Sequence, residues 1–373
     1  MINLRLNYRD GAHIEISGDP GNYTAVFENE NTGEEIWRCD IGVGEWAKTY
    51  QKYYIPWRIS ILRDGNKIYQ TSLDLNGKRV AVFIESSSLG DNLAWIPYLS
   101  EFGNKHNCEI HCVSNLGYLF KDSYSDVTFI SFDEYSKNES SYFAKYRIGW
   151  FIKENAESNT SLCPNDIRTQ PMQKSATDVL GLEYREMRPI INGLDQDRPK
   201  KNKVTIGIQS TSQAKYWNNE DGWNKVCEYL IQKGYDVVDI DKDKVFGSPE
   251  KWNTIPDLAK DDTGNIPLYD RIKSISESKL FIGLGSGLSW LAWAVGTPVV
   301  LISGFSKPYT EPSEGVTRIF NPDVCNGCFN DPSLKIDPSD WMWCPRKKGT
   351  PEQFVCTKSI TPEMVISELE KLI

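Results

Sequence analysis

The chain has 373 residues, of which 39% are hydrophobic and 25% charged, a composition typical of a soluble globular protein. At about 100–200 residues per domain, this length predicts two or three domains. The formal net charge of −9 argues against a general nucleic-acid-binding protein.

Residues 1–76 have the pattern of a small β-rich domain, either an antiparallel sheet or a barrel. Short strand-like segments alternate with turns at Asp10-Gly11, Thr32-Gly33 and Asp64-Gly65, where glycine tolerates a positive φ. The first residues, MINLRLNYRDG, lack the apolar stretch of a secretory signal, so we expect a cytoplasmic protein. The longest apolar run, 288–305, is interrupted by glycines and a proline and predicts no membrane span.

Residues 77–200 change to an α/β pattern that predicts a Rossmann-like domain. The continuous apolar run RVAVFIE, 79–85, is typical of a strand buried on both faces. A loop at 86–91 and a helix at 92–102 follow. Further strands are expected at 108–114, 126–132 and 146–151, then a polar, irregular stretch at 153–178. The polar segment 195–203 is the expected linker to the next domain.

Residues 201–373 predict a second Rossmann-like domain. Strands are expected at 204–208, 235–240, 279–283 and 298–303, and helices at 220–233, 267–278 and 287–295. The last helix is expected to begin with Thr361 as N-cap and Pro362 at its first position, and to bury Val365, Leu369 and Leu372. The fold class is therefore α/β, with two Rossmann-like domains that face each other and bind ligands at the carboxyl ends of their strands.

A cysteine-rich insertion at 324–357 carries the pattern Cys325-x2-Cys328-x15-Cys344-x11-Cys356. Four thiolates provide the tetrahedral all-sulfur ligation that suits zinc or iron, and a site with no open position is normally structural. Two disulfides, or four unrelated thiols, are the alternatives. The disulfides need an oxidising compartment, whereas the other five of the nine cysteines show no framework spacing.

Three polar loops fall at the ends of predicted strands. In the first, 86–91, Asp91 is either the N-cap of the following helix or a general base that reaches into the cleft. The second, 209–217, combines hydroxyls with Lys215 and is either a phosphate site or an ordinary polar loop. The third, 283–290, has glycines spaced GxGxG, which suits a diphosphate at a helix N-terminus but also a tight turn.

Together the loops predict one acid, one cation and two cradles for phosphates, an arrangement that suits transfer from a nucleotide-diphosphate donor. The residues expected to contact the donor are Ser88, Gly90, Ser210, Thr211, Ser212, Gln213, Gly285, Ser286, Gly287, Leu288 and Ser289.

Several segments resemble the heptosyltransferases of lipopolysaccharide synthesis. SSSLGDNLAWIPYL resembles their S-S-x-G-D segment, and STSQAKYWN resembles their T-T-x-x-x-K-x-W loop. FIGLGSGLSWLAWAVGTPVVLI resembles their nucleotide loop, where the usual D-T-G-L-x-H reads GSGLSW, with Gly285 and Trp290 in place of Asp and His. The closer resemblance is to the bacterial autotransporter heptosyltransferases, which join a small N-terminal β domain to a two-domain GT-B core and carry a similar four-cysteine finger.

The resemblance implies an inverting transfer of heptose from ADP-heptose to serine hydroxyls of an autotransporter passenger. It implies that 77–200 lies on the acceptor side and that 201–373 binds the nucleotide-sugar. It also implies iron in the finger, whereas the spacing alone favours zinc, and assembly of subunits into large rings.

As a mechanistic hypothesis, Asp91 accepts the proton of the acceptor hydroxyl and Lys215 stabilises the charge on the leaving diphosphate, with no catalytic divalent cation. Two other functions fit the same scaffold. A nucleotide-sugar epimerase, or another nucleotide-sugar enzyme, would change the sugar without an acceptor. A non-catalytic binding or assembly protein would use the β domain and the finger and would not need Asp91 or Lys215.

Overall fold

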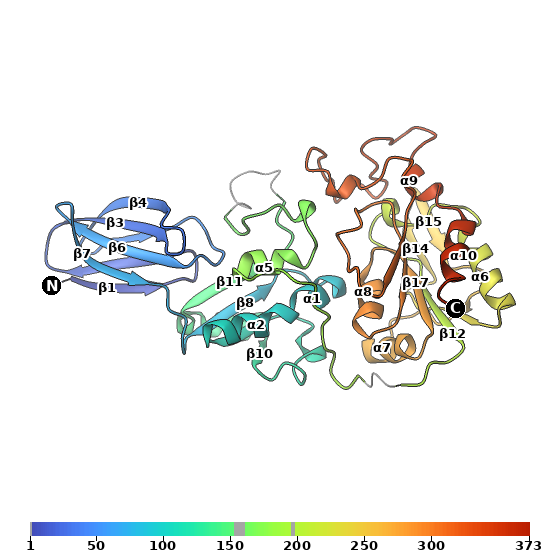
Figure 1. Cartoon of the computed structure of the whole chain (residues 1–373), viewed down its shortest axis with the longest axis horizontal. Helices are drawn as coiled ribbons and strands as arrows, with labels where there is room; N and C mark the ends of the chain where they lie inside the picture. Colours follow the sequence, from blue (N-terminus) through green and yellow to red (C-terminus); the bar gives the residue numbers. More distant parts are fainter. Residues whose placement is uncertain (1, 153–160, 195–197) are drawn as a thin grey trace. The chain divides into compact units, whose positions relative to one another are not determined.

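The computed structural model describes residues 2–152, 161–194 and 198–373, and groups the chain into two compact units that are interleaved in sequence (Figure 1). The first unit comprises Met1–Ser87, Trp95–Ile167 and Gln173–Met187. The second comprises Ser88–Ala94, Arg168–Met172 and Arg188–Ile373. The short segment Ser88–Ala94, which contains Asp91, therefore packs with the second unit.

The N-terminal part of the first unit is all β, as predicted. Strands β1, β2 and β5 form one antiparallel sheet, and the second antiparallel sheet has the order β4-β3-β6-β7. At the β6–β7 hairpin, Asp64 and Gly65 both have positive φ, 51° and 78°, which gives the strands their tight two-residue turn. The strands are β1 Ile2–Asn7, β2 His13–Gly18, β3 Asn22–Asn29, β4 Glu35–Gly42, β5 Trp46–Lys48, β6 Trp57–Arg63 and β7 Asn66–Ser72.

The rest of the first unit is built on a parallel sheet of order β10-β9-β8-β11. Strand β8 coincides with the predicted buried strand, and five of its six residues are buried. The predicted helix at 92–102 is instead two helices, because Pro97 has no N–H with which to continue the bonding of the first. The elements are β8 Arg79–Ile84, α1 Leu89–Trp95, α2 Pro97–His106, β9 Glu109–Val113, η1 Gly117–Leu119, β10 Val127–Ile130, α3 Phe132–Lys137, η2 Glu139–Ser141, β11 Ala144–Ile148, η4 Ile167–Thr169 and α5 Lys174–Leu180.

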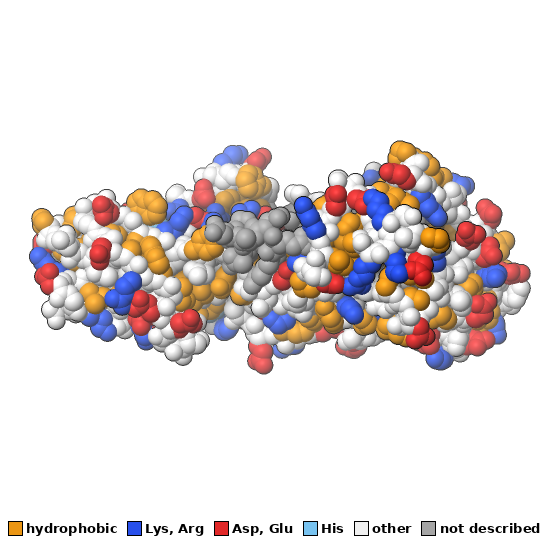
Figure 2. Space-filling model, turned by 90° about the horizontal axis from the view of Figure 1, so that it is seen from above, with side chains coloured by type: hydrophobic (Ala, Val, Ile, Leu, Met, Phe, Trp, Pro, Cys, Tyr) orange, Lys and Arg blue, Asp and Glu red, His pale blue; other side chains and the backbone are white. Residues whose placement is uncertain are grey.

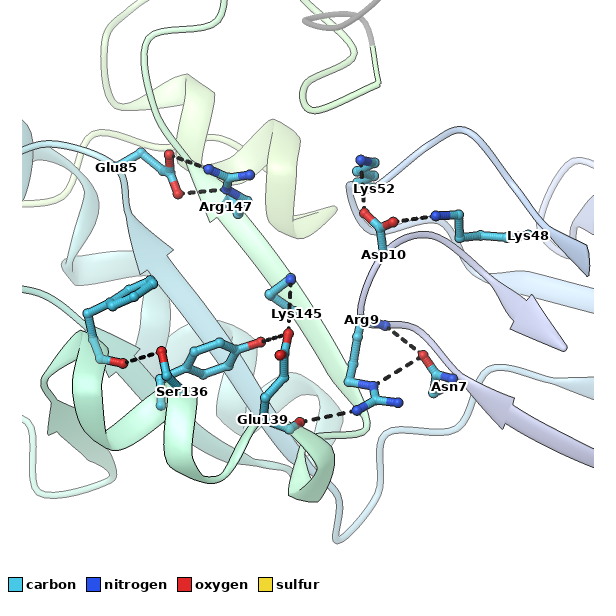
Figure 3. A network of polar contacts seen from close by, with 12 residues as sticks. Asn7, Arg9, Asp10, Lys48, Lys52, Glu85, Ser136, Glu139, Lys145 and Arg147 are labelled. Atoms are coloured by element: carbon cyan, nitrogen blue, oxygen red, sulfur yellow. Dashed lines mark hydrogen bonds and ion pairs between the residues drawn. The ribbon is translucent and has the colours of Figure 1, made fainter. Parts of the chain in front are cut away.

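The β domain is joined to this parallel sheet along its edge strand β11. Tyr8 forms an isolated parallel bridge with Ala144, with its N–H donated to the Phe143 carbonyl at 2.7 Å. Nearby, Arg9 donates to the backbone carbonyl of Glu139 at 3.3 Å, and the Glu139 carboxylate pairs with Lys145 at 3.7 Å (Figure 3). These bonds cover an edge that would otherwise expose unpaired backbone groups.

The second unit contains a six-stranded parallel sheet of order β16-β13-β12-β17-β18-β19. Its elements are β12 Lys203–Gly207, η5 Gln213–Lys215, α6 Gly222–Gln232, β13 Asp236–Asp239, β14 Val245–Ser248, β15 Lys251–Thr254, β16 Lys260–Asp261, α7 Leu268–Ser276, β17 Leu280–Gly283, α8 Gly287–Ala294, β18 Val299–Ile302, β19 Val316–Ile319, η6 Cys328–Asn330, α9 Val355–Lys358 and α10 Pro362–Leu369. The hairpin β14–β15 and the strands β16 and β19 were not expected from the sequence.

The C-terminal helix α10 confirms its predicted start. The Thr361 hydroxyl accepts the N–H of Met364, and Pro362 occupies the first turn. Val365 and Leu369 are fully buried, but the prediction that Leu372 is buried was wrong, because the helix ends at Leu369 and Leu372 is 43% exposed.

Three further observations bear on the predictions. Of the predicted polar stretch 153–178, residues 153–160 lie outside the described part of the chain, as do 195–197 of the predicted linker. Within the described residues, no helix is both long and apolar enough to span a bilayer. On the face drawn in Figure 2, acidic and basic side chains are interspersed, so neither sign of charge covers it.

Candidate active site

The first and third predicted loops meet inside the second unit. A side chain at Gly90 would lie 3.1 Å from the Trp290 ring and 3.5 Å from the Gly287 Cα. A side chain at Gly287 would in turn lie 3.2 Å from the Leu89 Cβ and 3.4 Å from the Gly90 nitrogen. The two glycines thus allow the start of α1 to approach the start of α8 at backbone distance.

Asp91 lies in the first turn of α1, and its residue exposure is only 5%. The helix begins at Leu89, two residues before Asp91, so the interpretation of Asp91 as an N-cap was wrong. A carboxylate in the first turn is favoured by the positive end of the helix dipole. The folded chain therefore holds a largely buried acid beside the loop of α8.

Lys215 lies in the short turn η5, which follows β12. Its ammonium donates to the Thr211 hydroxyl at 3.4 Å and lies 5.4 Å from the centre of the Phe305 ring. Burial lowers the pKa of Lys215, while the negative charges of Glu311 and then Asp91 oppose that shift. Lys215 therefore shares one electrostatic environment with two carboxylates.

A network of buried amide side chains holds the Lys215 loop in place. Gln213 is fully buried, donates to Asn218 at 2.8 Å, and accepts from Asn253 at 2.9 Å and from the Trp341 indole at 3.3 Å. The Gln213 side chain thus fixes the loop rather than facing a ligand, which corrects its prediction as a donor contact. The helix α6 begins at Gly222, close to its predicted start at 220, and therefore lies beyond this loop.

The start of the same loop is tied to a buried acid pair on β13 and just after it. Asp241 accepts the backbone N–H of Ile208 at 2.6 Å, and Asp239 accepts the N–H of Asp241 at 3.0 Å. Burial, and then the charge of its neighbour, raises the pKa of Asp239. This pair had no signature in the sequence beyond the polar end of a strand.

The third loop begins the helix α8, with Ser286 in an extended conformation at the N-cap. The Ser289 hydroxyl is buried and donates to the Leu284 carbonyl at 2.5 Å, so it closes the loop on itself. The N–H of Ser286 donates to the Leu284 carbonyl at 2.7 Å. The backbone N–H groups of Gly285 and Gly287, which are half-buried, remain the part of this loop that can face an anion. Ser210 is buried in the second loop, whereas Thr211 is exposed there.

Glu311 and Arg318 form a buried ion pair beside this loop, and the sequence analysis did not identify them. Their side chains are 10% and 9% exposed, and Glu311 also accepts the Ser306 hydroxyl at 2.8 Å. Glu311 lies in a segment of prolines, serines and tyrosine that follows β18, with no pattern that marks it. Only the pairing of β18 with β17 and β19 brings it to the third loop.

The four cysteines of the finger form no disulfide, and they lie within electrostatic range of one another. The pKa of the Cys356 thiol is raised to about 12, first by burial and then by Cys328, Cys325 and Cys344. The guanidinium of Arg346 lies 3.6 Å from the Cys328 sulfur. Within the described residues, however, no three or more Cys, His, Asp or Glu side chains are arranged closely enough to form a metal site.

The finger packs directly against the Lys215 loop. Ala214 shares a small apolar cluster with Cys344 and Phe354, and Phe305 and Met342 pack against it. The backbone N–H of Gln213 donates to the Trp341 carbonyl at 3.0 Å. Two features that are about 110–140 residues apart in sequence thus form one structural element.

Comparison with known proteins gives a consistent result over nearly the whole chain. The sequence model of glycosyltransferase family 9 (heptosyltransferase) matches residues 157–329. The autotransporter heptosyltransferase Aah of Escherichia coli is 36% identical over 98% of this chain and 92% of its own length. BimC of Burkholderia thailandensis, named an inactive autotransporter heptosyltransferase, is 31% identical over 97% of this chain and 84% of its own.

Solved structures agree with these relatives. TibC from enterotoxigenic E. coli, described as a bacterial iron-containing dodecameric glycosyltransferase, has a TM-score of 0.90 at 35% identity, covering 99% of this chain and 95% of TibC. A second structure shows TibC, there called a heptosyltransferase, in complex with ADP-D-beta-D-heptose.

Proposed function

This chain belongs to the autotransporter heptosyltransferases, and from that membership we propose that it transfers heptose from ADP-heptose to serine hydroxyls of an autotransporter passenger, with inversion at the anomeric carbon. The observation that carries the proposal is the grouping of Asp91, Lys215 and the third loop within one unit of the chain.

Asp91 is the general base. In a single inverting displacement, the acceptor oxygen forms a bond to the anomeric carbon while the bond to the diphosphate oxygen breaks. The carboxylate of Asp91 takes the proton that the serine hydroxyl loses, which keeps the attacking oxygen nucleophilic. The ordered position of Asp91 in the first turn of α1 supports this role, because a base must be held within hydrogen-bond reach of its proton.

Lys215 stabilises the leaving ADP. The departing diphosphate gains negative charge in the transition state, and a partly desolvated ammonium interacts with that charge more strongly than one in bulk water. Backbone N–H groups at the start of α8 and the hydroxyls of Ser210, Thr211 and Ser212 complete the proposed cradle. Because these groups supply the required positive potential, the mechanism needs no catalytic divalent cation.

The four finger cysteines are the proposed ligands of a structural iron, with zinc as the alternative, by analogy with the iron-containing TibC. Cysteine sulfur is a ligand type that suits iron or zinc, although the side chains of the described residues are not grouped as a metal site in this structure. Gly304 packs closely on the finger, since a side chain there would lie 2.7 Å from the Cys356 Cβ. When bound, the metal supplies cross-linking and no reaction step.

We further propose three domains: a β domain at 1–76, an acceptor-side domain at 77–200 and a nucleotide-sugar domain at 201–373, the last two forming a GT-B pair. The dodecameric state described for TibC supports a homo-oligomer, which we propose to be a ring. The inactive relative BimC motivates one competing function, in which the chain binds partners without turnover.

The experiment is co-expression of the protein with an autotransporter passenger in cells that make ADP-heptose, followed by intact mass spectrometry of the passenger. The proposal expects one or more added heptoses with the wild type and loss of the modification with Asp91→Asn. An unmodified passenger with a folded wild-type protein would favour the non-catalytic function. Conversion of the donor sugar without any passenger would favour an epimerase.

A further inference from the structure

Glycine at position 285 is required by the lack of room for a side chain and not by the backbone conformation. It is not among the residues with positive φ, so its backbone suits any amino acid. A Cβ at this position would nevertheless lie 2.9 Å from Oε1 of Glu311. The volume that a side chain at position 285 would fill is therefore occupied by a carboxylate from another part of the chain.

That carboxylate is fixed and cannot simply move aside. Its Oε2 pairs with Nη1 of Arg318 at 2.5 Å, and its Oε1 accepts the Ser306 hydroxyl at 2.8 Å. Arg318 is itself anchored, because Nη2 donates to the Ser306 carbonyl at 2.7 Å and to its hydroxyl at 3.0 Å. Bidentate use of the guanidinium gives the group a defined geometry.

The sheet topology explains why these residues meet. Gly285, Glu311 and Arg318 come from the segment after β17, the segment after β18 and the strand β19, and these three strands are parallel neighbours. Ligands of open parallel sheets bind at the carboxyl ends of the strands. Glu311 also acts on Lys215 electrostatically, and its effect there exceeds that of Asp91.

The charge of Glu311 restricts what it can contact. A carboxylate repels the phosphates of the donor, but it is a strong acceptor for neutral hydroxyl groups. The loop that carries Gly285 resembles a pattern with Asp at that position, D-T-G-L-x-H. In that pattern the residue at this position carries a carboxylate itself, whereas in this chain Glu311 places a carboxylate against Gly285.

We propose that Glu311 stands in for the missing side chain at position 285 and accepts a hydrogen bond from a hydroxyl of the sugar that is transferred. This role rests on the proposed function, since it requires a nucleotide-sugar donor. Glu311 is then a residue that selects the sugar, whereas Lys215 and the amides of α8 bind the diphosphate.

The test compares the binding of ADP and ADP-heptose by isothermal titration calorimetry. Glu311→Ala removes a charge that repels the diphosphate of both ligands, so the ratio of the two Kd values is the readout. Because ADP lacks the sugar, the variant is expected to raise the Kd of ADP-heptose relative to that of ADP by about 10- to 100-fold, the range for a hydrogen bond to a charged group. If Glu311 had only a structural role, its removal would weaken the binding of both ligands by a similar factor. Thermal unfolding of each variant monitors whether loss of the partner of Arg318 affects folding.

Two further variants keep the test decisive if Glu311→Ala does not fold. Gly285→Ala leaves the ion pair in place but inserts a methyl group against Oε1. It is expected to raise the Kd of ADP-heptose more than the Kd of ADP, whose diphosphate also faces this loop in the proposed function. Gly285→Asp combined with Glu311→Ala returns a carboxylate to the same volume and is expected to recover at least part of the lost affinity, whereas Gly285→Asp alone should be as defective as Gly285→Ala.

The outcomes separate this role from the function on which it rests. A wild-type protein that binds ADP-heptose no differently from ADP would overturn the proposed function and this role with it. A wild type that does distinguish them, together with Gly285→Ala and Glu311→Ala variants that bind both ligands as the wild type does, would overturn the role of Glu311 alone. If Gly285→Asp does not restore ADP-heptose binding to the Glu311→Ala variant, that result also contradicts the role of Glu311.

Discussion

Replacement of Lys215 by alanine should impair turnover far more than folding. The ammonium is partly desolvated, which lowers its pKa, so its burial already costs folding free energy. Its removal relieves that cost and leaves Glu311 with its Arg318 partner. We therefore expect the free energy of unfolding to change by less than about 1 kcal/mol, as for a side chain with few specific contacts.

The effect on catalysis is different in size. By analogy with the loss of one oxyanion donor, removal of the cation should lower kcat about 10²- to 10³-fold, or about 3–4 kcal/mol. The assay is release of ADP under saturating ADP-heptose and passenger, with kcat and KM determined separately. Urea denaturation of the same preparations measures the free energy of unfolding.

Lys203→Ala is the matched control. Lys203 lies in β12 of the same unit, and burial also lowers its pKa, but it donates to Ser274 and its charged neighbours are Glu277, Lys201 and Asp262. The kcat of the Lys203→Ala variant should stay within about twofold of the wild-type value. A Lys215→Ala protein that is folded and turns over like the Lys203→Ala control would refute the role of Lys215 in stabilising the leaving group.

Three more outcomes follow from the contacts. Burial raises the pKa of Asp239 to about 8, so the folded state holds a proton that the unfolded state releases, and stability should fall by up to about 1.4 kcal/mol per pH unit between about pH 4 and 8. Asp239→Asn should flatten this slope in urea denaturation at pH 5, 6.5 and 8, and an unchanged slope would exclude Asp239 as its source. Trp341→Phe removes the indole hydrogen bond to Gln213 but leaves the bond from Asn253, so the free energy of unfolding should fall by about 0.5–1.5 kcal/mol while kcat falls and bound metal is unchanged. An unaltered kcat would show that the indole of Trp341 does not help to position the Lys215 loop. Removal of the metal by a chelator should lower Tm and alter the size of the oligomer in size-exclusion chromatography before activity is lost. A stable, correctly assembled but inactive apo-protein would contradict a structural role for the metal.

The parts of the fold that the sequence predicted are those encoded by local patterns. Continuous apolar runs located β8 and β12, and a hydroxyl followed by proline located the start of α10. The same patterns placed Asp91 and Lys215 in the segments that follow β8 and β12, where the structure has α1 and η5. The break between α1 and α2 could have been predicted too, because Pro97 marks it.

The remaining features depend on contacts between distant segments, which one sequence does not reveal. Gln213 was predicted to contact the donor because it lies in a polar loop, yet Asn218, Asn253 and Trp341 bury its side chain. Glu311 reaches the third loop only through the pairing of β18 with β17. The finger, which the sequence placed after the last predicted strand, packs against the loop of Lys215.

The most direct test of the proposed activity is intact mass spectrometry of an autotransporter passenger co-expressed with the wild-type protein or with Asp91→Asn. The account predicts heptose-sized mass additions on the passenger with the wild type, and an unmodified passenger with a folded, assembled Asp91→Asn protein. Equal modification by the two proteins would contradict Asp91 as the general base, and an unmodified passenger with both would contradict heptose transfer itself.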